Sequence, residues 1–366
     1  MKLLANDLRR QFCLYKQEYN KKVIEILNSG WYILGNEVKA FEEEFAAYVG
    51  TKYCVGLANG LDALEVAFRL IGISSGDEVL VSSNAYIACV MGITKNGGIP
   101  IFVEPDQYDN IDANKLEEKI TKKTKAILAV HLYGQSCNMT KITEIAKKYN
   151  LKIVEDCAQA HGTMWNGKKC GSFSDIACWS FYPTKNLGAF GDGGAITTNS
   201  KQYDVDARMI RNYGSQVHYE FKVVGMNSRL DEIQAGMLRI KLKYLDELNK
   251  ERARTAIRYV NEIKNPLIVP LATRPGSNNI WHQFVIHVSN YRDELIKYLN
   301  EKEIGFNIHY PIPPHLSNAY KELGYKKGDF PIAERYADEV LSIPMFNGIT
   351  DDEIARVIEV LNNFCV

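Results

Sequence analysis

Short apolar runs alternate with helix-like stretches over the first half of the chain. The apolar runs have the length and composition of β-strands and cover residues 53–57, 78–82, 99–103, 126–132 and 152–155. Helix-like patterns at 62–71 and 141–149, and a further segment at 86–94, lie between these runs. Strands separated by helices form parallel βαβ units, in which both faces of the sheet are buried. The pattern therefore predicts an α/β sheet domain.

The pattern changes after residue 173. Two β-type runs, 176–181 and 194–198, are joined through the glycine-dense segment 188–194. A long charged amphipathic helix is predicted from about 229 to 259, and it connects to a smaller region with a strand at 281–288 and helices at 292–301 and 351–364. We predict a large domain over residues 1–250, including the N-terminal segment, and a small C-terminal domain over residues 251–366.

Composition narrows the class of protein. A chain of 366 residues with 46% apolar content can bury a large core. The 44 basic and 44 acidic residues balance, which disfavours binding to nucleic acid or an anionic membrane. No window approaches the ~18 apolar residues of a membrane span, and the N-terminus has no signal-peptide core, so we expect a cytoplasmic protein. The eight cysteines lack zinc-site spacing, and no metal site is predicted.

Asp156 and Lys185 are the first candidates for chemistry. Asp156 ends an apolar run, and ligands of open parallel sheets bind at the carboxyl ends of strands. There a carboxylate can hold the pyridine nitrogen of pyridoxal 5'-phosphate (PLP) in its protonated form. Lys185 lies between an aromatic run and a glycine-rich loop, and its amine can bond covalently to the cofactor aldehyde. The alternatives are a turn-capping aspartate and a solvated surface lysine.

A phosphate and a pyridine ring need further partners. Gly60 and Leu61 stand where a strand passes into a helix, and a helix N-terminus offers free N–H groups to an anion. Ser180 can add a hydroxyl, and Tyr86, after another strand, can stack on the ring. Each of these residues taken alone is also compatible with a turn or with core packing. Together they favour a PLP enzyme.

The chain resembles the DegT/DnrJ/EryC1/StrS family of PLP-dependent nucleotide-sugar aminotransferases over nearly its whole length. The most specific stretch is Glu155-Asp156-Cys157-Ala158-Gln159-Ala160-His161-Gly162, followed by residues 180–186 and 191–194. Further matching blocks are residues 30–35, 41–45, 58–60, 76–79, 131–134, 212–214, 227–232 and 309–311. The resemblance implies the aspartate aminotransferase-type fold (fold type I), with a large mixed-sheet α/β domain and a smaller C-terminal α+β domain.

The resemblance also implies roles for individual residues. Lys185 would carry the cofactor covalently, Asp156 would bind the pyridine nitrogen, and Gln159 would contact the ring or its hydroxyl. The phosphate would be held by Gly60, Leu61 and Ser180, and by Asn227 from the other subunit of a homodimer with shared active sites. The substrate pocket would include His161, Tyr182, Arg229, His309 and Tyr310.

The implied reaction is transamination of a nucleotide-linked keto sugar, with L-glutamate as amino donor. Residues 83–88 and 103–106 resemble the branch that aminates C3 of dTDP-linked 3-keto-6-deoxyhexoses. Amination of a 4-keto sugar is the alternative within the same class. A PLP-binding dehydratase-like or regulatory homologue without turnover is the alternative of another class, although the branch that dehydrates carries histidine where this chain has Lys185. The configuration of the sugar and the nucleotide stay open.

Overall fold

A seven-stranded mixed sheet forms the centre of the molecule. The computed structural model describes residues 2–217 and 219–366. The strands lie in the order β1-β9-β8-β5-β4-β2-β3. Their bounds are β1 (Tyr53–Leu57), β2 (Glu78–Ser82), β3 (Ile99–Val103), β4 (Thr124–Val130), β5 (Lys152–Asp156), β8 (Ile176–Ser180) and β9 (Gly194–Thr198). The predicted α/β domain, with a large mixed sheet, is confirmed.

The sheet is parallel from β3 to β8 and antiparallel on both sides of β9. The runs predicted to form parallel βαβ units are parallel to one another, and β9, which lies in the later segment where the pattern changes, is the strand that makes the sheet mixed. The chain between β8 and β9 contains no helix, so it returns in the opposite direction and β9 enters the sheet antiparallel. That return path is the loop 181–193, which places Lys185 above the carboxyl end of β8.

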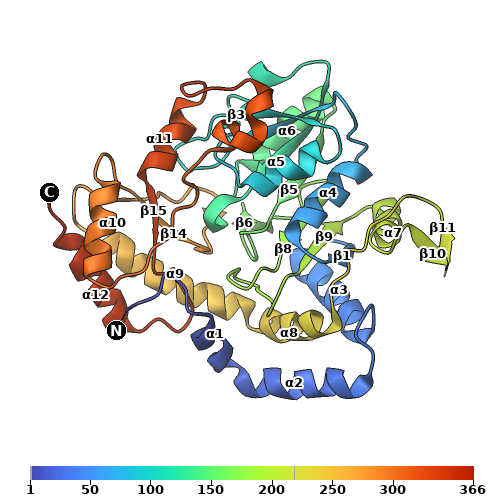
Figure 1. The fold of residues 1–366 in the computed structure, drawn as a ribbon, viewed down its shortest axis with the longest axis horizontal. Coiled ribbons are helices and arrows are strands. Elements are labelled where there is room, and N and C mark those ends of the chain that lie inside the picture. The colour runs from blue at the N-terminus through green and yellow to red at the C-terminus, as the bar shows by residue number, and fades with distance from the viewer. Residues whose placement is uncertain (1, 218) are drawn as a thin grey trace.

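Helices cover both faces of the sheet (Figure 1), so most strand residues are buried. One face packs against α4 (Gly60–Leu70), α5 (Ile87–Thr94) and α7 (Lys201–Ile210). The other face packs against α3 (Asn36–Val49), α6 (Met139–Tyr149) and α8 (Glu232–Lys243). Because the core lies on both sides, side chains at the strand ends are left to form a site.

The predicted helix 229–259 is two helices, α8 and α9 (Leu245–Glu262), which separate at Tyr244. The backbone of Tyr244 leaves the helical region at φ −108° and ψ 2°. Its ring stacks on Tyr15 at 4.1 Å between centroids, and its hydroxyl donates to Glu18. These contacts attach α8 to the N-terminal arm, which consists of α1 (Leu8–Leu14) and α2 (Lys16–Ser29).

The C-terminal part contains a three-stranded sheet, three helices and two short 3₁₀ turns. Its elements are β12 (Val269–Pro270), β14 (Phe284–His287), β15 (Val340–Ile343), α10 (Arg292–Glu301), α11 (Pro331–Glu339), α12 (Asp351–Asn362), η3 (Pro314–Leu316) and η4 (Asn318–Leu323). Leu3 pairs with Ile304 and packs in this core, so the N-terminal strand segment lies on the small domain. The predicted strand 281–288 is shorter because residues 280–283 form a loop that hydrogen-bonds to Tyr133 and Gly134.

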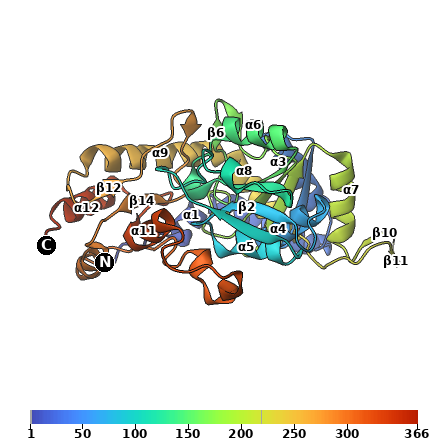
Figure 2. The same cartoon turned by 90° about the horizontal axis from the view of Figure 1, so that it is seen from above.

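Smaller elements complete the chain. They are β6 (Met164–Trp165), β7 (Lys168–Lys169), β13 (Ser277–Asn278), β10 (Ser215–Val217), β11 (Glu220–Phe221), η1 (Glu117–Lys119) and η2 (Leu132–Gly134). The β10–β11 hairpin projects from the body on the side opposite the two termini (Figures 1 and 2). Within residues 2–217 and 219–366, no helix is both long enough and apolar enough to cross a membrane.

Candidate active site

A cavity of about 430 Å³ lies at the carboxyl ends of β4, β5 and β8, and loops of the small domain form its opposite wall. The structure brings ten of the predicted site residues to its lining, namely Gly60, Leu61, Tyr86, Asp156, Gln159, Ser180, Tyr182, Lys185, His309 and Tyr310. The cavity has the size and location that small-molecule sites in α/β proteins have.

Three predicted residues lie outside that lining. His161 is fully buried between the rings of Trp179 and Phe181, and burial lowers its pKa to about 3. Asn227 is exposed, and the Arg229 guanidinium donates to Asn212 Oδ1 at 3.1 Å. In this single chain, these residues do not reach the cavity.

Asp156 is the last residue of β5 and is buried at the base of the cavity. Its Oδ1 accepts a hydrogen bond from the Ala158 N–H at 3.0 Å. Its Oδ2 accepts one from the Cys89 thiol at 3.1 Å, and Cys89 lies on α5. These two donors fix the plane of the carboxylate, and the remaining lone pairs are available to an N–H group in the cavity.

Lys185 follows a turn in which its N–H donates to the Tyr182 carbonyl at 2.8 Å. Gly188 is required nearby, because a side chain there would collide with the Pro183 carbonyl. Burial lowers the pKa of Lys185 to about 8, although the negative charge of Asp156 opposes the shift. A substantial fraction of the amine is therefore neutral and nucleophilic near neutral pH, as covalent attachment to an aldehyde requires.

The pH dependence of this attachment is a direct prediction. The rate at which PLP bonds to the cofactor-free protein should rise with pH and level off above about 8, because only the neutral Lys185 amine reacts. Stopped-flow absorbance of the covalent adduct measures it. Pyridoxamine phosphate has no aldehyde and is the matched control, since its association should lack this rise. A rate that is flat across this range would contradict the lowered pKa.

The N-terminus of α4 forms a cradle that fits a phosphate group. Asn59 caps the helix by accepting from the Asp62 N–H at 2.8 Å, which leaves the Gly60 and Leu61 N–H groups at the open end. A Cβ atom on Gly60 would lie 2.7 Å from Cβ of Ser180, so only glycine allows the helix to approach this hydroxyl so closely. Two free amides, a hydroxyl and the positive end of the helix dipole suit a phosphate.

A group of aromatic side chains forms the wall above Asp156. The rings of Tyr86 and Tyr310 lie 4.8 Å apart, and Gln159 Nε2 donates to the Tyr310 hydroxyl at 3.1 Å. Gln159 Oε1 accepts from the Tyr133 N–H at 2.6 Å, and the Tyr133 hydroxyl donates to the His309 carbonyl. A flat ring placed against Asp156 would therefore have aromatic side chains to pack against.

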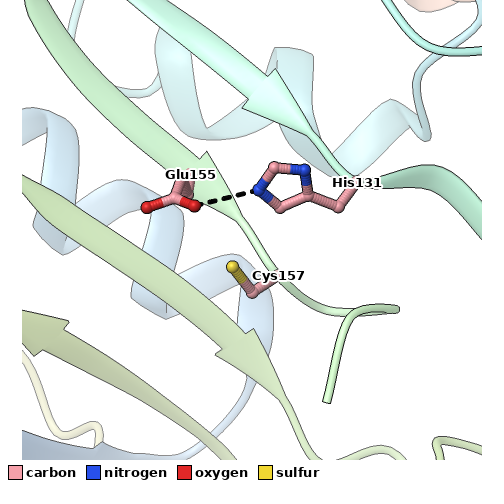
Figure 3. A group of neighbouring side chains, drawn as sticks. All are labelled: His131, Glu155 and Cys157. Atoms are coloured by element: carbon pink, nitrogen blue, oxygen red, sulfur yellow. Dashed lines mark hydrogen bonds and ion pairs between the residues drawn. The ribbon is translucent and has the colours of Figure 1, made fainter. Parts of the chain in front are cut away.

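A buried polar cluster lies next to Asp156, at the carboxyl ends of β4 and β5. Glu155, His131 and Cys157 face one another in Figure 3. The His131 Nδ1 atom accepts from the Cys137 N–H at 3.1 Å, so its Nε2–H donates to Glu155 Oε1 at 3.0 Å. Glu155 also accepts from the Gly171, Phe173 and Ser174 N–H groups and the Ser174 hydroxyl. Against the opposing effect of burial, His131 first, and then Gly171 and Ser174, lower the pKa of Glu155. Hydrogen bonds account for this cluster, which anchors the loop 171–174.

Replacing Glu155 should therefore affect stability strongly. We expect Glu155→Gln to lower the free energy of unfolding by about 3–5 kcal/mol, because the amide cannot accept from all of these buried donors. Urea denaturation of both proteins measures the difference. Glu117→Gln, which removes an exposed ion pair with Lys148, is the control and should change stability by less than about 0.5 kcal/mol. A small effect at Glu155 would contradict the anchoring role.

Of the two blocks that suggest the C3 branch, residues 83–88 include Tyr86 of the cavity lining, whereas residues 103–106 make structural contacts outside it. Glu104 accepts from the Ile332 and Ala333 N–H groups at 2.9 and 3.1 Å, so it caps α11 of the small domain. Asp106 pairs with Arg274 and accepts from the Tyr336 hydroxyl through its carbonyl. These contacts join the large domain to the small one.

Sequence reasoning missed several lining residues. Cys89, His282 and Gln283 all face the cavity. Cys89 lies in an apolar segment that is typical of core packing, and His282 and Gln283 lie in the predicted strand 281–288. The neighbouring sequence does not identify them as site residues. Cys89 bonds to Asp156, 67 positions away, and His282 bonds to Asn186, 96 positions away.

Comparisons with known proteins agree with this geometry. Residues 14–362 match the model of the DegT/DnrJ/EryC1/StrS aminotransferase family. The chain is 51% identical to the dTDP-3-amino-3,6-dideoxy-alpha-D-galactopyranose transaminase of Aneurinibacillus thermoaerophilus, over 98% of each chain. It superposes on the S. venezuelae DesV crystal structure, solved in complex with a ketimine intermediate, with a TM-score of 0.97, 40% identity and coverage of 99% and 98%.

A third relative is more distant. The NtdA structure from Bacillus subtilis, with bound cofactor PMP, matches with a TM-score of 0.87 and 29% identity, over 94% of this chain and 80% of that one. The predicted family and the fold type I architecture are thus confirmed. The chain belongs to the DegT/DnrJ/EryC1/StrS aminotransferase family.

Proposed function

We propose that this protein is a PLP-dependent aminotransferase that converts a dTDP-linked 3-keto-6-deoxyhexose into the 3-amino sugar, with L-glutamate as amino donor. The observation that carries the proposal is a single cavity that unites the Lys185 amine, the Asp156 carboxylate and the phosphate cradle of α4. The relative at 51% identity supports the sugar class, because it is named as a transaminase of a dTDP-3-amino-3,6-dideoxyhexose.

Different residues of the cavity bind different parts of the cofactor in this proposal. The Gly60 and Leu61 N–H groups and the Ser180 hydroxyl hold the phosphate, and Asp156 pairs with the pyridine nitrogen. Tyr86 covers the ring. PLP, when bound, supplies the electron sink that stabilises negative charge at the carbon losing its proton. These contacts leave the pocket between Tyr182, His309 and Tyr310 for the sugar.

Lys185 moves the proton in both half-reactions. Its freed amine takes the proton from Cα of glutamate in the first half-reaction and gives a proton to C3 of the sugar in the second. Burial favours this exchange, because it brings the pKa of Lys185 to about 8 and makes both protonation states accessible. General acid–base catalysis of this kind contributes about 10²–10⁴-fold to a rate.

A homodimer completes the site in this proposal. Large apolar side chains are exposed on and beside the β10–β11 hairpin, including Val217, Phe221 and Val224, the last at 84% exposure. Exposed apolar groups on a soluble protein mark interaction surfaces, and a second copy would cover them. Asn227 follows this hairpin and is itself exposed, which suits a residue that reaches the phosphate cradle of the partner.

Mixed dimers test the sharing of sites. Asn227→Ala should raise the dissociation constant of PLP by about 10-fold or more, because a hydrogen bond to a charged phosphate is lost. A heterodimer of Asn227→Ala with Lys185→Ala should regain activity at limiting PLP, since one site then holds Lys185 of the first subunit and the intact Asn227 of the second. If Asn227 acts within its own subunit, neither site is intact and mixing restores nothing.

The substrate assignment is tested with L-[¹⁵N]glutamate and two dTDP-linked keto sugars. We expect 2-oxoglutarate and a ¹⁵N-labelled amino sugar from the 3-keto substrate, with the label located at C3 by NMR. Turnover of only the 4-keto sugar would shift the assignment to the alternative within the class. Formation of no 2-oxoglutarate with either sugar would favour the non-transaminating class of homologue.

A further inference from the structure

A chain of buried amides leads from the core to a histidine on the cavity wall. Asn249 Nδ2 donates to the His161 carbonyl at 2.8 Å, and Asn186 Nδ2 donates to Asn249 Oδ1 at 2.8 Å. Asn186 Nδ2 also donates to the Ile280 carbonyl at 3.1 Å. The Asn186 Oδ1 atom lies 3.1 Å from Nδ1 of His282, which lines the cavity.

The direction of each hydrogen bond follows from its ends. A backbone carbonyl only accepts, so the NH₂ groups of Asn249 and Asn186 face the carbonyls of His161 and Ile280. The Asn186 oxygen therefore faces His282, and Nδ1 of His282 must carry the proton. Nε2 is left with one lone pair, and Gln283 Nε2 donates to it only at 3.5 Å, a long contact that a closer donor in the cavity would displace.

The surroundings keep this ring neutral. Burial and the positive charges of Lys185 and Arg252 lower the pKa of His282, with His309 and His161 facing it as further basic groups. Arg252 itself donates to the carbonyls of Trp281 and His282, which holds the loop in place. His282 thus offers the cavity a hydrogen-bond acceptor and cannot act there as a cationic donor.

We propose that Nε2 of His282 accepts a hydrogen bond from the free Lys185 amine during turnover. Asn186, held by Asn249, keeps the His282 ring in the tautomer with the proton on Nδ1, so Nε2 stays the acceptor. In the proposed site Asp156 pairs with the pyridine nitrogen of the cofactor, which leaves the His282 lone pair on the same cavity wall as a separate acceptor for the lysine. The hydrogen bond would keep the freed amine beside the reacting carbons. The inference rests on the proposed role of Lys185.

The tautomer is measured directly by NMR of protein labelled with ¹⁵N-histidine, with PLP bound and without substrate, and His282→Gln assigns the signal. We expect a neutral ring with the proton on Nδ1 at pH 7. Asn186→Leu should release the lock and move the proton toward Nε2. A wild-type ring that is charged, or protonated on Nε2, would overturn the proposal, and this result does not depend on which sugar is the substrate.

Single-turnover kinetics test the partner of Nε2. His282→Phe should slow the glutamate and sugar half-reactions alike, by about 10²-fold, because misplacement of a shared catalytic group affects both. His282→Gln retains an acceptor and should recover part of the rate. His315→Gln, a buried histidine paired with Glu334 outside the cavity, is the control for folding. A loss confined to the sugar half-reaction would assign His282 to sugar binding and sink the proposal, whereas Lys185 is tested separately by cofactor attachment.

Discussion

Replacing Lys185 by alanine should abolish covalent attachment of PLP and reduce turnover by at least about 10²–10⁴-fold, the contribution of a general acid–base group. The wild-type protein should be yellow with PLP, and borohydride should trap the cofactor on the peptide that contains Lys185. The reason is that Lys185 lines the cavity beside Asp156 and has its pKa lowered to about 8 by burial. Absorbance, peptide mass spectrometry and steady-state kinetics measure the three effects.

Lys16→Ala is the matched control, because Lys16 is an exposed lysine at the start of α2. It should retain colour, attachment and turnover. Modification of a different lysine by borohydride, or a Lys185→Ala protein with unchanged kinetics, would remove Lys185 from its proposed role. A wild-type protein that stays colourless with added PLP would contradict the cofactor assignment as a whole.

Asp156→Asn should have the second largest effect. The amide keeps the shape of the side chain but loses the negative charge that holds the pyridine nitrogen protonated, so the electron sink is weakened. We expect turnover to fall by about 10- to 150-fold, which corresponds to the loss of a charged hydrogen bond of about 1.5–3 kcal/mol in a buried site. The melting temperature should change far less, because among the described residues the Asp156 carboxylate accepts only two hydrogen bonds.

Asp206→Asn is the control for this change, since Asp206 lies on α7 and accepts only from Gln202 on the surface. It should leave both turnover and melting temperature unchanged. Equal turnover of Asp156→Asn and the wild type would show that this carboxylate does not act on the cofactor. A large loss of stability without a specific loss of turnover would assign Asp156 a structural role instead.

Much of the secondary structure in both domains could be predicted from local patterns. Strands β1, β2 and β3 and helix α10 have the predicted bounds, because apolar runs and amphipathic spacing are properties of neighbouring residues. The same reasoning placed Asp156 at a strand end and Gly60 at a helix start, where ligands bind. It failed at Tyr244, because the break between α8 and α9 coincides with a contact to Tyr15 on a distant segment.

The sequence by itself determined the chemical groups of the site: a lysine, a strand-end carboxylate and a glycine-led helix, in an order that matches one family of aminotransferases. Only the tertiary structure decided which of the other side chains face them. In the folded chain His161 is buried in the core, Cys89 hydrogen-bonds to Asp156, and His282 hydrogen-bonds to Asn186. The physical reason is that local periodicity determines secondary structure, whereas these contacts depend on how segments far apart in the chain pack together.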